Sequence, residues 1–344
     1  MKAALLYRGE RELRLVESSP RPLKKGEATI RVLASGLCGS DLKILRGVLE
    51  LPTYPQILGH EIMGRVVEAR PSGPGEERAI EALDGRNVLV HPYCNCGQCD
   101  YCLSNRANLC TARRRLGWEV PGGFAEEANV PVGNLVPTSL GEEASVLTDA
   151  GATTLHALRK VPFSLGTPVA IMGVGGLGAF AVQIARLMGG QVIALDRSRS
   201  SLSLAEKLGS NLALDTASTS PEEAKKTVAS EMRGRLPGVF VDFVGNEQSL
   251  ALAMALLAPG GRLLQVGYSP AAYTNMATKE VVYRELQLLG SLASTVGDLR
   301  DMVALVETGR VKLDVTRRYA LDDVNMALRD LDQNKVQGRA IVAP

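Results

Sequence analysis

The sequence PVAIMGVGGLG at residues 168–178 carries the strongest fold signal of this chain. Its apolar half predicts a short buried strand, and its glycines predict a tight turn. Residues 179–188 then show the apolar spacing of a helix, which the glycines at 189 and 190 would end. A second apolar strand, residues 191–196, finishes on Asp196. A strand, turn, helix and strand within about 30 residues form the unit that binds a dinucleotide.

Each glycine of the turn has its own task. Gly173 makes the tight turn, Gly175 lets the backbone approach a pyrophosphate, and Gly178 lets the helix pack on the strand. Gly176 and Leu177 complete the turn, and the helix that follows offers free N–H groups and a positive dipole end to the phosphates. We therefore expect the cofactor phosphates at this turn.

Asp196 lies 23 residues after Gly173. In dinucleotide-binding domains, an acidic residue at about this distance from the glycine turn binds the adenosine ribose. Its carboxylate would accept hydrogen bonds from the 2′-hydroxyl and repel a 2′-phosphate, which predicts NAD rather than NADP. Arg197, next to it, could instead hold a 2′-phosphate, and Asp196 alone could be a solvated acid at a strand end. The context of strand and turn favours the NAD interpretation.

Four more apolar segments follow at helical intervals: Asn211–Leu214, Val239–Val244, Arg262–Val266 and Leu286–Leu292. Strands that alternate with helices predict a parallel sheet covered on both faces. Six such strands with the ligand at their carboxyl edge form a doubly wound Rossmann domain of the α/β class.

The bulk composition narrows the class of protein. A chain of 344 residues usually holds two domains. The formal net charge of +2 is too small to indicate a nucleic-acid partner, and no run of about 18 uninterrupted apolar residues predicts a membrane span. The start, MKAALLYRGERELRL, has charges where a signal peptide needs an apolar run. We expect a cytoplasmic enzyme that acts on a small molecule.

Five of the six cysteines lie between Cys94 and Cys110. Four of them have the spacing of a metal site: Cys96, Cys99, Cys102 and Cys110. Zn²⁺ in a structural role prefers such a closed tetrahedral shell, whereas disulfides need an oxidising compartment that nothing here suggests. We predict a structural zinc on these four thiolates and a small buried or partly exposed thiol at Cys94. A closed site has no position for a substrate, so the chemistry must lie elsewhere.

The first 150 residues are rich in Val, Gly and Pro and predict short strands and turns. They contain Cys38, His60 and Asp149, three ligand types that would leave a fourth position of a catalytic zinc open. Taken singly, the cysteine could be a buried hydrophobe, the histidine a turn residue and the aspartate a helix N-cap. The spacing of these three residues in the sequence does not indicate that they bind the same metal ion.

The order of these motifs resembles the zinc-dependent medium-chain alcohol dehydrogenases. CGSD at 38–41, GHE at 59–61, the cysteine lobe and the GxGxxG turn follow one another as in that family, over essentially the whole chain. The resemblance implies a mostly β, GroES-like catalytic domain at 1–150 and 292–344, with a structural-zinc lobe at about 91–112, and an NAD-binding Rossmann domain at 151–291.

The resemblance also assigns roles to single residues. Cys38, His60 and Asp149 would bind the catalytic zinc, so the chain would carry two zinc ions. Asp41 would hold the imidazole of His60 from behind, and Glu61 would lie behind the metal.

Other residues would serve the substrate proton and the nicotinamide. Ser40 would hydrogen-bond the alkoxide and start a proton path, and Thr153 would pack near the nicotinamide. The backbone around Val266, Gly267, Ser291 and Leu292 would hold the carboxamide.

Two positions depart from the family pattern. Gly39 stands where many members have a basic residue bound to pyrophosphate, and Arg339 near the C-terminus is a candidate replacement. Lys43 stands where many members have a histidine that passes the proton to solvent. Lys43 itself, or the ribose hydroxyls with water, would replace it.

The implied activity is reversible hydride transfer between NAD and an alcohol paired with its ketone or aldehyde. Candidate wall residues lean apolar and favour a hydrophobic secondary or cyclic alcohol: Leu42, Leu45, Leu49, Leu116 and Trp118. A polyol or L-threonine-type dehydrogenase and a non-catalytic dinucleotide-binding member remain alternatives. We also expect a homo-oligomer, a dimer or tetramer, because the apolar strand Glu285–Leu292 would otherwise leave an open sheet edge.

Overall fold

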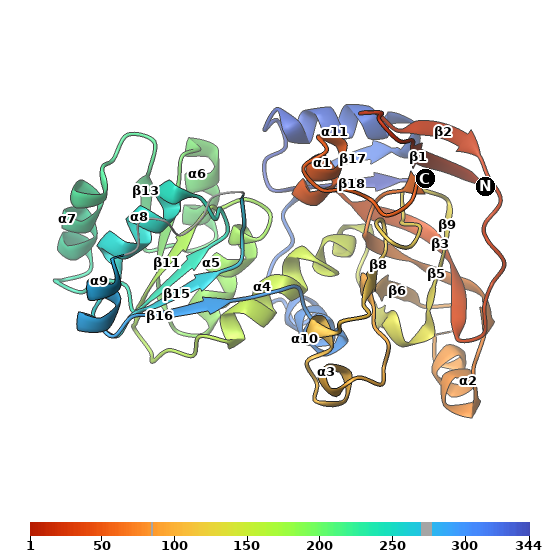
Figure 1. Cartoon of the computed structure of the whole chain (residues 1–344), viewed down its shortest axis with the longest axis horizontal. Helices are drawn as coiled ribbons and strands as arrows, with labels where there is room; N and C mark the ends of the chain where they lie inside the picture. The colour runs from red at the N-terminus through yellow and green to blue at the C-terminus, as the bar shows by residue number, and fades with distance from the viewer. Residues whose placement is uncertain (84, 270–276) are drawn as a thin grey trace. The chain divides into compact units, whose positions relative to one another are not determined.

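The computed structural model describes residues 1–83, 85–269 and 277–344, which form two compact units (Figure 1). One unit consists of Met1–Ala152, Ser294–Gly309 and Leu313–Pro344, and the other of Thr153–Ala293 and Arg310–Lys312. The second unit is thus inserted into the sequence of the first.

The inserted unit contains a parallel sheet of six strands in the order β13-β12-β11-β14-β15-β16. Its strands are β11 (Pro168–Met172), β12 (Gln191–Asp196), β13 (Leu212–Asp215), β14 (Val239–Asp242), β15 (Arg262–Gln265) and β16 (Gln287–Gly290). This order reverses direction at β11, as in the Rossmann fold, and confirms the predicted doubly wound sheet.

Helices connect consecutive strands of this sheet. The connecting helices are α5 (Gly178–Leu187), α6 (Arg199–Lys207), α7 (Pro221–Glu231), α8 (Glu247–Leu256) and α9 (Thr278–Tyr283). Of these, α5 to α8 pack on the sheet. Helix α4 (Ala150–Arg159) precedes β11, and its first residues belong to the other unit. The glycine-rich turn leads directly into α5, whose apolar face is buried against the sheet. The helix ends where predicted, because Gly189 adopts a φ of +89° that a residue with a side chain rarely takes.

The other unit is built on a mixed sheet in the order β10-β6-β5-β3-β18-β17, with β9 also paired to β3. Its strands are β3 (Glu27–Gly36), β5 (Glu61–Arg70), β6 (Asn87–Val90), β9 (Glu127–Pro131), β10 (Leu135–Thr138), β17 (Val315–Ala320) and β18 (Arg339–Ala343). In Figure 1 the blue C-terminal strands lie beside the red N-terminal ones, because β18 pairs antiparallel with the end of β3. This pairing brings the C-terminal segment to the residues around Cys38.

Smaller elements complete this unit. Two further sheets contain β1 (Lys2–Leu6), β2 (Arg14–Glu17) and β4 (Gln56–Ile57), and the pair β7 (Tyr93–Cys94) and β8 (Arg114–Arg115). The helices are α1 (Gly39–Leu45), α2 (Pro74–Glu81), α3 (Asp100–Leu103), α10 (Val296–Glu307) and α11 (Val324–Asp332).

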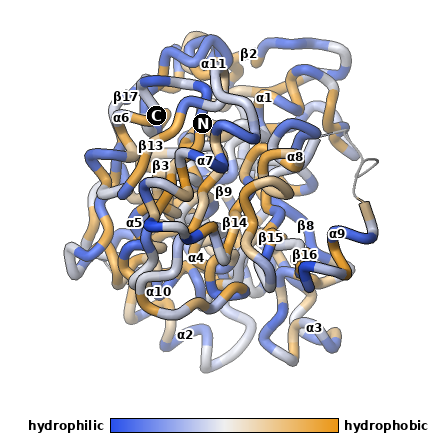
Figure 2. Tube along the Cα trace, turned by 90° about the vertical axis from the view of Figure 1, so that its left-hand side faces the viewer, coloured by the Kyte–Doolittle hydropathy of each residue, from blue (hydrophilic) through white to orange (hydrophobic). Residues whose placement is uncertain are grey.

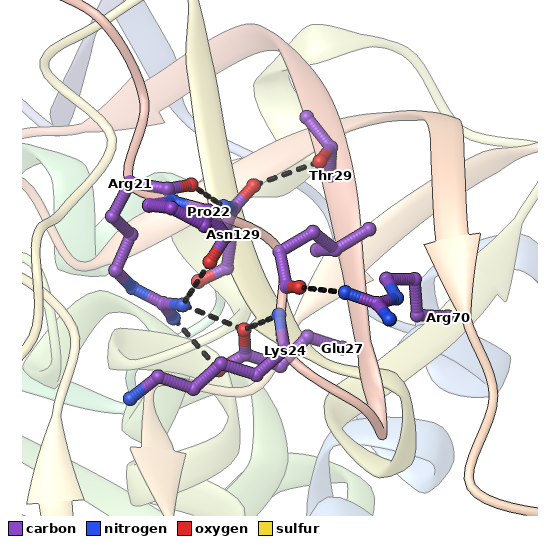
Figure 3. A network of polar contacts seen from close by, with 8 residues as sticks. Arg21, Pro22, Lys24, Glu27, Thr29, Arg70 and Asn129 are labelled. Atoms are coloured by element: carbon purple, nitrogen blue, oxygen red, sulfur yellow. Dashed lines mark hydrogen bonds and ion pairs between the residues drawn. The ribbon is translucent and has the colours of Figure 1, made fainter.

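A polar network fixes the segment that leads into β3 (Figure 3). Arg21 makes two hydrogen bonds to the carboxylate of Glu27, of 2.6 and 2.7 Å, and the N–H of Lys24 donates to the same carboxylate at 2.9 Å. Asn129 donates to the Arg21 carbonyl at 2.7 Å and accepts from the Thr29 hydroxyl at 2.8 Å. The network therefore attaches a loop to two strands of the main sheet.

Among the described residues, no helix is long and apolar enough to cross a membrane. Figure 2 shows hydrophobic stretches of the trace interrupted throughout by hydrophilic ones.

Candidate active site

The glycine turn after β11 has the geometry that a dinucleotide site needs. A Cβ atom on Gly178 would lie 2.0 Å from the Gly173 carbonyl oxygen, so only glycine lets the helix pack this closely. Gly173 has a φ of +88°, and a Cβ on Gly175 would meet nothing within 4 Å. The backbone at Gly175 is therefore open to a close approach, while Gly176 and Leu177 lead into α5.

Asp196 ends β12 and is tied to this turn. One oxygen of its carboxylate accepts the N–H of Val174 at 2.7 Å, and the other accepts the N–H of Ser198 at 2.8 Å. The neighbouring Arg197 is exposed. The carboxylate therefore has a fixed position beside the phosphate turn, and each oxygen retains a lone pair for a further donor.

The four spaced cysteines come together around α3. The Sγ distances are 3.5 Å for Cys99–Cys102, 3.5 Å for Cys96–Cys110 and 3.9 Å for Cys96–Cys102. A tetrahedral zinc with Zn–S bonds of about 2.3 Å requires sulfur atoms roughly 3.8 Å apart. The set therefore fits a structural zinc.

Cys94 lies outside this group. Its thiol is buried in the apolar core of the β-rich unit, and burial raises its pKa to about 11. The group of four cysteines whose sulfur atoms lie within 4.8 Å of one another does not include Cys94.

A second group of ligand atoms gathers at the ends of α1, β5 and the segment before α4. The donor atoms of Cys38, His60, Glu61 and Asp149 all lie within 4.8 Å of one another. Asp149 Oδ2 is 3.7 Å from Cys38 Sγ and 3.5 Å from His60 Nε2. One thiolate, one imidazole and carboxylate oxygens form a donor set that suits zinc.

Asp41 supports the histidine from its other side. Its Oδ1 lies 3.6 Å from His60 Nδ1, and its Oδ2 accepts the N–H of Cys38 at 3.0 Å. Burial lowers the pKa of His60, but contacts with Asp149 and Asp41 outweigh it and raise the pKa well above the ordinary value. The imidazole of His60 thus lies between two carboxylates.

Glu61 is held by Arg339, which β18 supplies from the C-terminal segment. Arg339 Nη2 lies 2.5 Å from Glu61 Oε1 and also contacts Oε2, and both side chains are buried. Burial raises the pKa of Glu61 to about 7, although Arg339 and His60 act to lower it. Phosphate binding by Arg339 stays a prediction, since this guanidinium nitrogen is directed at Glu61.

Gly36 is a residue that the sequence analysis missed. A Cβ atom there would lie 1.9 Å from Glu61 Oε2, so the carboxylate occupies the space of the absent side chain. A glycine inside a strand pattern marks such close approaches, and Gly36 ends β3 just before Cys38. That signal was available in the sequence.

Ser40 and Lys43 lie on α1, three residues apart and therefore on one face of the helix. Both are partly exposed, and burial lowers the pKa of Lys43 while Cys38 acts to raise it. The two residues expected to carry the proton thus share the helix that begins just after Cys38.

The five candidate wall residues fall into two groups. Leu42, Leu45 and Leu49 are partly buried against the core around α1. Leu116 and Trp118 are buried, and the Trp118 indole N–H donates to the Glu50 carbonyl at 3.1 Å.

The residues assigned to the nicotinamide lie in the inserted unit. Val266 and Gly267 follow β15, and Ser291 follows β16, with its N–H bonded to the Gln265 carbonyl at 2.9 Å. Leu292 is exposed and Thr153 is buried in α4. The carboxyl edge of the sheet thus presents the glycine turn, Asp196 and these segments.

Comparison with known proteins agrees with this arrangement. Two family models match: the alcohol dehydrogenase GroES-like domain at residues 24–140 and the zinc-binding dehydrogenase at residues 176–308. An NAD-dependent alcohol dehydrogenase of Sulfolobus acidocaldarius is 31% identical over an alignment of 357 positions, which covers 99% of each protein.

Solved structures show the same relationship. The alcohol dehydrogenase of the archaeon Aeropyrum pernix has 32% identity and a TM-score of 0.89 over all of both chains. Acetophenone reductase from Geotrichum candidum, solved in complex with NAD, has 29% identity and a TM-score of 0.88 over 100% of this chain and 97% of that one. The resemblance seen in the motif order is confirmed, and the chain belongs to the zinc-dependent medium-chain alcohol dehydrogenases, a family of oxidoreductases.

Proposed function

We propose that this chain is an NAD-dependent dehydrogenase that interconverts a hydrophobic secondary or cyclic alcohol and its ketone. The observation that carries the proposal is the four-donor group around His60, whose ligand atoms lie within 4.8 Å of one another. A non-catalytic dinucleotide-binding protein would have no need of a second ligand set beside the closed cysteine site.

Cys38, His60 and Asp149 would hold the catalytic zinc and leave its fourth position open to the substrate, with Glu61, which is paired with Arg339, behind the metal. A zinc ion bound there supplies a Lewis acid for the alcohol or carbonyl oxygen. Asp41 keeps the His60 ring oriented, since it contacts the nitrogen that faces away from Asp149.

The proton of the alcohol would leave through α1. Ser40 lies two residues after Cys38 and carries a hydroxyl that can accept and pass on a proton. Lys43, one helical turn later, or the ribose hydroxyls with water, would carry the proton to solvent. The hydride itself would go to NAD, which the glycine turn and Asp196 would bind.

Apolar residues on and after α1 support the proposed substrate class. Leu42, Leu45 and Leu49 are partly buried and offer hydrocarbon surface rather than hydroxyl or amide partners. The likeness to an acetophenone reductase points to ketones of similar character. Polyols would require polar partners in their place.

A substrate panel tests the proposal. We expect secondary and cyclic alcohols to give the highest kcat/KM with NAD, and polyols and L-threonine to give little turnover. Higher kcat/KM for a polyol would overturn the substrate class, and no turnover with any alcohol in protein that contains two zinc ions would favour the non-catalytic alternative.

We also propose a homo-oligomer that forms through the edge of the Rossmann sheet. The edge strand β16 carries Leu288, 43% exposed, and the helix before it carries Val282 and Tyr283, 69% and 79% exposed. Pairing of two β16 strands would cover this surface. Light scattering should give a dimer or tetramer at micromolar concentration, and Leu288→Lys should shift it toward the monomer.

A further inference from the structure

Asp242, the last residue of β14, has no part in the chemistry described above, yet it is 0% exposed and fully hydrogen-bonded. One oxygen of its carboxylate accepts the N–H groups of Val244 and Gly245, at 2.8 and 2.9 Å. The other accepts the Ser249 hydroxyl at 2.6 Å, a length typical of a hydroxyl bonded to a charged carboxylate. The side chain therefore sets the path of the chain from β14 into α8.

The backbone carbonyl of Asp242 hydrogen-bonds a second loop, which follows β15. Its carbonyl oxygen accepts the N–H groups of both Val266 and Gly267, each at 2.9 Å, where the chain leaves β15. One residue thus bonds the loops after two neighbouring strands, one through its side chain and the other through its backbone.

These two loops lie in backbone contact. A Cβ atom on Gly245 would lie 2.4 Å from the Gly267 carbonyl oxygen, and one on Gly267 would lie 2.1 Å from the Phe243 carbonyl oxygen. The Ser269 hydroxyl also donates to the Gly245 carbonyl at 2.6 Å. A shift of residues 244–245 must therefore move residues 266–267 as well.

The position in the sheet says which part of a dinucleotide these loops would meet. The sheet order reverses at β11, and each half of such a sheet takes one mononucleotide. Asp196 lies on the adenosine side, on β12, so β14 and β15 belong to the nicotinamide side. We propose that Asp242 is a positioning residue, whose carboxylate holds the two loops in the arrangement that binds the nicotinamide half of the cofactor. This inference rests on the proposed use of NAD.

A carboxylate suits this place better than an amide. The N–H groups of Val244 and Gly245 donate to one carboxylate oxygen, and the Ser249 hydroxyl donates to the other. An asparagine would offer only one oxygen as an acceptor, because its second group is an NH₂ donor. In Asp242→Asn either Ser249 or the two backbone N–H groups would lose a charged acceptor. The change is nearly isosteric, so it tests hydrogen bonding rather than packing.

The experiment compares the affinities of NADH and ADP-ribose for the zinc-loaded enzyme by calorimetry, with NADH fluorescence as a second signal. ADP-ribose lacks the nicotinamide, so it reports the adenosine side alone. We expect Asp242→Asn to raise the Kd of NADH roughly 10- to 100-fold, as expected for a lost charge-assisted hydrogen bond, and to leave the Kd of ADP-ribose within about twofold. Ser249→Ala should raise the Kd of NADH by a smaller factor and should also leave the Kd of ADP-ribose unchanged. This variant replaces Asp242→Asn if Asp242→Asn does not fold.

Glu307→Gln is the matched control, since this carboxylate also accepts three hydrogen bonds, from the Ser139 N–H and the hydroxyls of Thr138 and Ser139. It lies in the other unit and should change neither Kd. If Asp242→Asn leaves the Kd of NADH unchanged, or raises the Kd of ADP-ribose by the same factor as that of NADH, the positioning role alone would be overturned. A wild-type enzyme that binds no NADH would overturn the use of NAD and this inference with it.

Discussion

Arg339 and Glu61 form a buried ion pair between residues 278 positions apart in the sequence. The Arg339 side chain is 7% exposed and the Glu61 side chain 0%, so both charged groups are largely withdrawn from bulk water. Such a pair costs desolvation energy, but removal of one partner leaves the other charge buried alone.

We therefore expect Arg339→Met to lower the free energy of unfolding by about 3–5 kcal/mol. Glu61→Gln added to it should recover part of the loss, because the buried charge is removed. Guanidinium denaturation of the two variants measures both effects. A loss below about 1 kcal/mol for Arg339→Met would show that Glu61 finds another partner or takes up a proton.

The two ligand sets predict that the metal content can be changed one ion at a time. Cys110→Ser should remove the structural zinc and His60→Ala the catalytic one, each leaving about one zinc per chain by metal analysis. Cys94→Ser is the matched control, since this thiol is buried in the apolar core, and it should keep both ions. Loss of a zinc from Cys94→Ser would mean that the lobe has a different ligand set.

Cofactor preference should depend on Asp196. Asp196→Gly removes the charge that repels a 2′-phosphate and leaves the exposed Arg197 free to attract it. Because the variant also loses the bonds to Val174 and Ser198, both cofactors should bind more weakly. The ratio of kcat/KM for NADP to that for NAD should nevertheless rise roughly tenfold or more. Asp215→Asn, at the end of the next strand, should leave the ratio unchanged, and a wild type that already prefers NADP would contradict the assignment.

The sequence predicted the elements of the inserted unit well, because apolar strands and glycine turns are local signals. It was less accurate where a side chain ends a strand. Val239–Val244 was predicted as one strand, but β14 ends at Asp242, whose carboxylate draws the N–H groups of residues 244 and 245 out of the sheet. An apolar strand that finishes on an acid was recognised at Asp196, but the apolar residues Phe243 and Val244 follow Asp242 and conceal the end of its strand.

The environment of Glu61 could not be predicted from the sequence. Gly36, Glu61 and Arg339 meet only because β18 returns from the C-terminus to pair with β3. Neither the spacing nor the composition of these segments encodes that contact. The proposed metal ligands Cys38, His60 and Asp149 are far apart in the sequence, so only the resemblance to a family related them; in the structure their donor atoms lie within 4.8 Å of one another.

The network around Glu27 predicts a pH dependence of stability (Figure 3). Burial acts to raise the pKa of Glu27, but Arg21 and the Lys24 N–H outweigh it and lower the pKa below the ordinary 4.5. A carboxyl group whose pKa is lower in the folded state than in the unfolded state stabilises the fold at pH values above its unfolded pKa. This stabilisation is lost as the pH falls through the folded pKa. The stabilisation should therefore be complete at neutral pH and decline below 4.5.

Arg21→Met should lower the free energy of unfolding by about 1–3 kcal/mol at pH 7, and the difference from wild type should shrink in acid. Urea denaturation at a series of pH values measures it. Arg329→Met is the control, because the pair of Arg329 with Glu12 is exposed on both sides and should contribute little at any pH. A pH-independent difference for Arg21→Met would show that packing, not charge, holds the segment.

The last prediction concerns the proton path along α1. Ser40 lies two residues after Cys38, a proposed zinc ligand, on the helix that begins there, so its hydroxyl is the proposed first acceptor of the substrate proton. Proton transfer by a positioned group contributes roughly 10²–10⁴-fold to the rate, and Ser40→Ala should lower kcat by about that factor while both zinc ions and NADH binding are retained.

Lys43 distinguishes two exits for that proton. Burial lowers the pKa of its ammonium group, which makes the side chain a better proton carrier than an exposed lysine. If Lys43 carries the proton, Lys43→Ala should lower kcat and shift its pH profile; if ribose hydroxyls and water carry it, the profile should match that of wild type. Near-normal turnover of Ser40→Ala, with a deuterium isotope effect showing that hydride transfer still limits the rate, would exclude Ser40 from the path. In that case the proton would leave without Ser40, and the pH profile of Lys43→Ala would still decide whether Lys43 or water receives it.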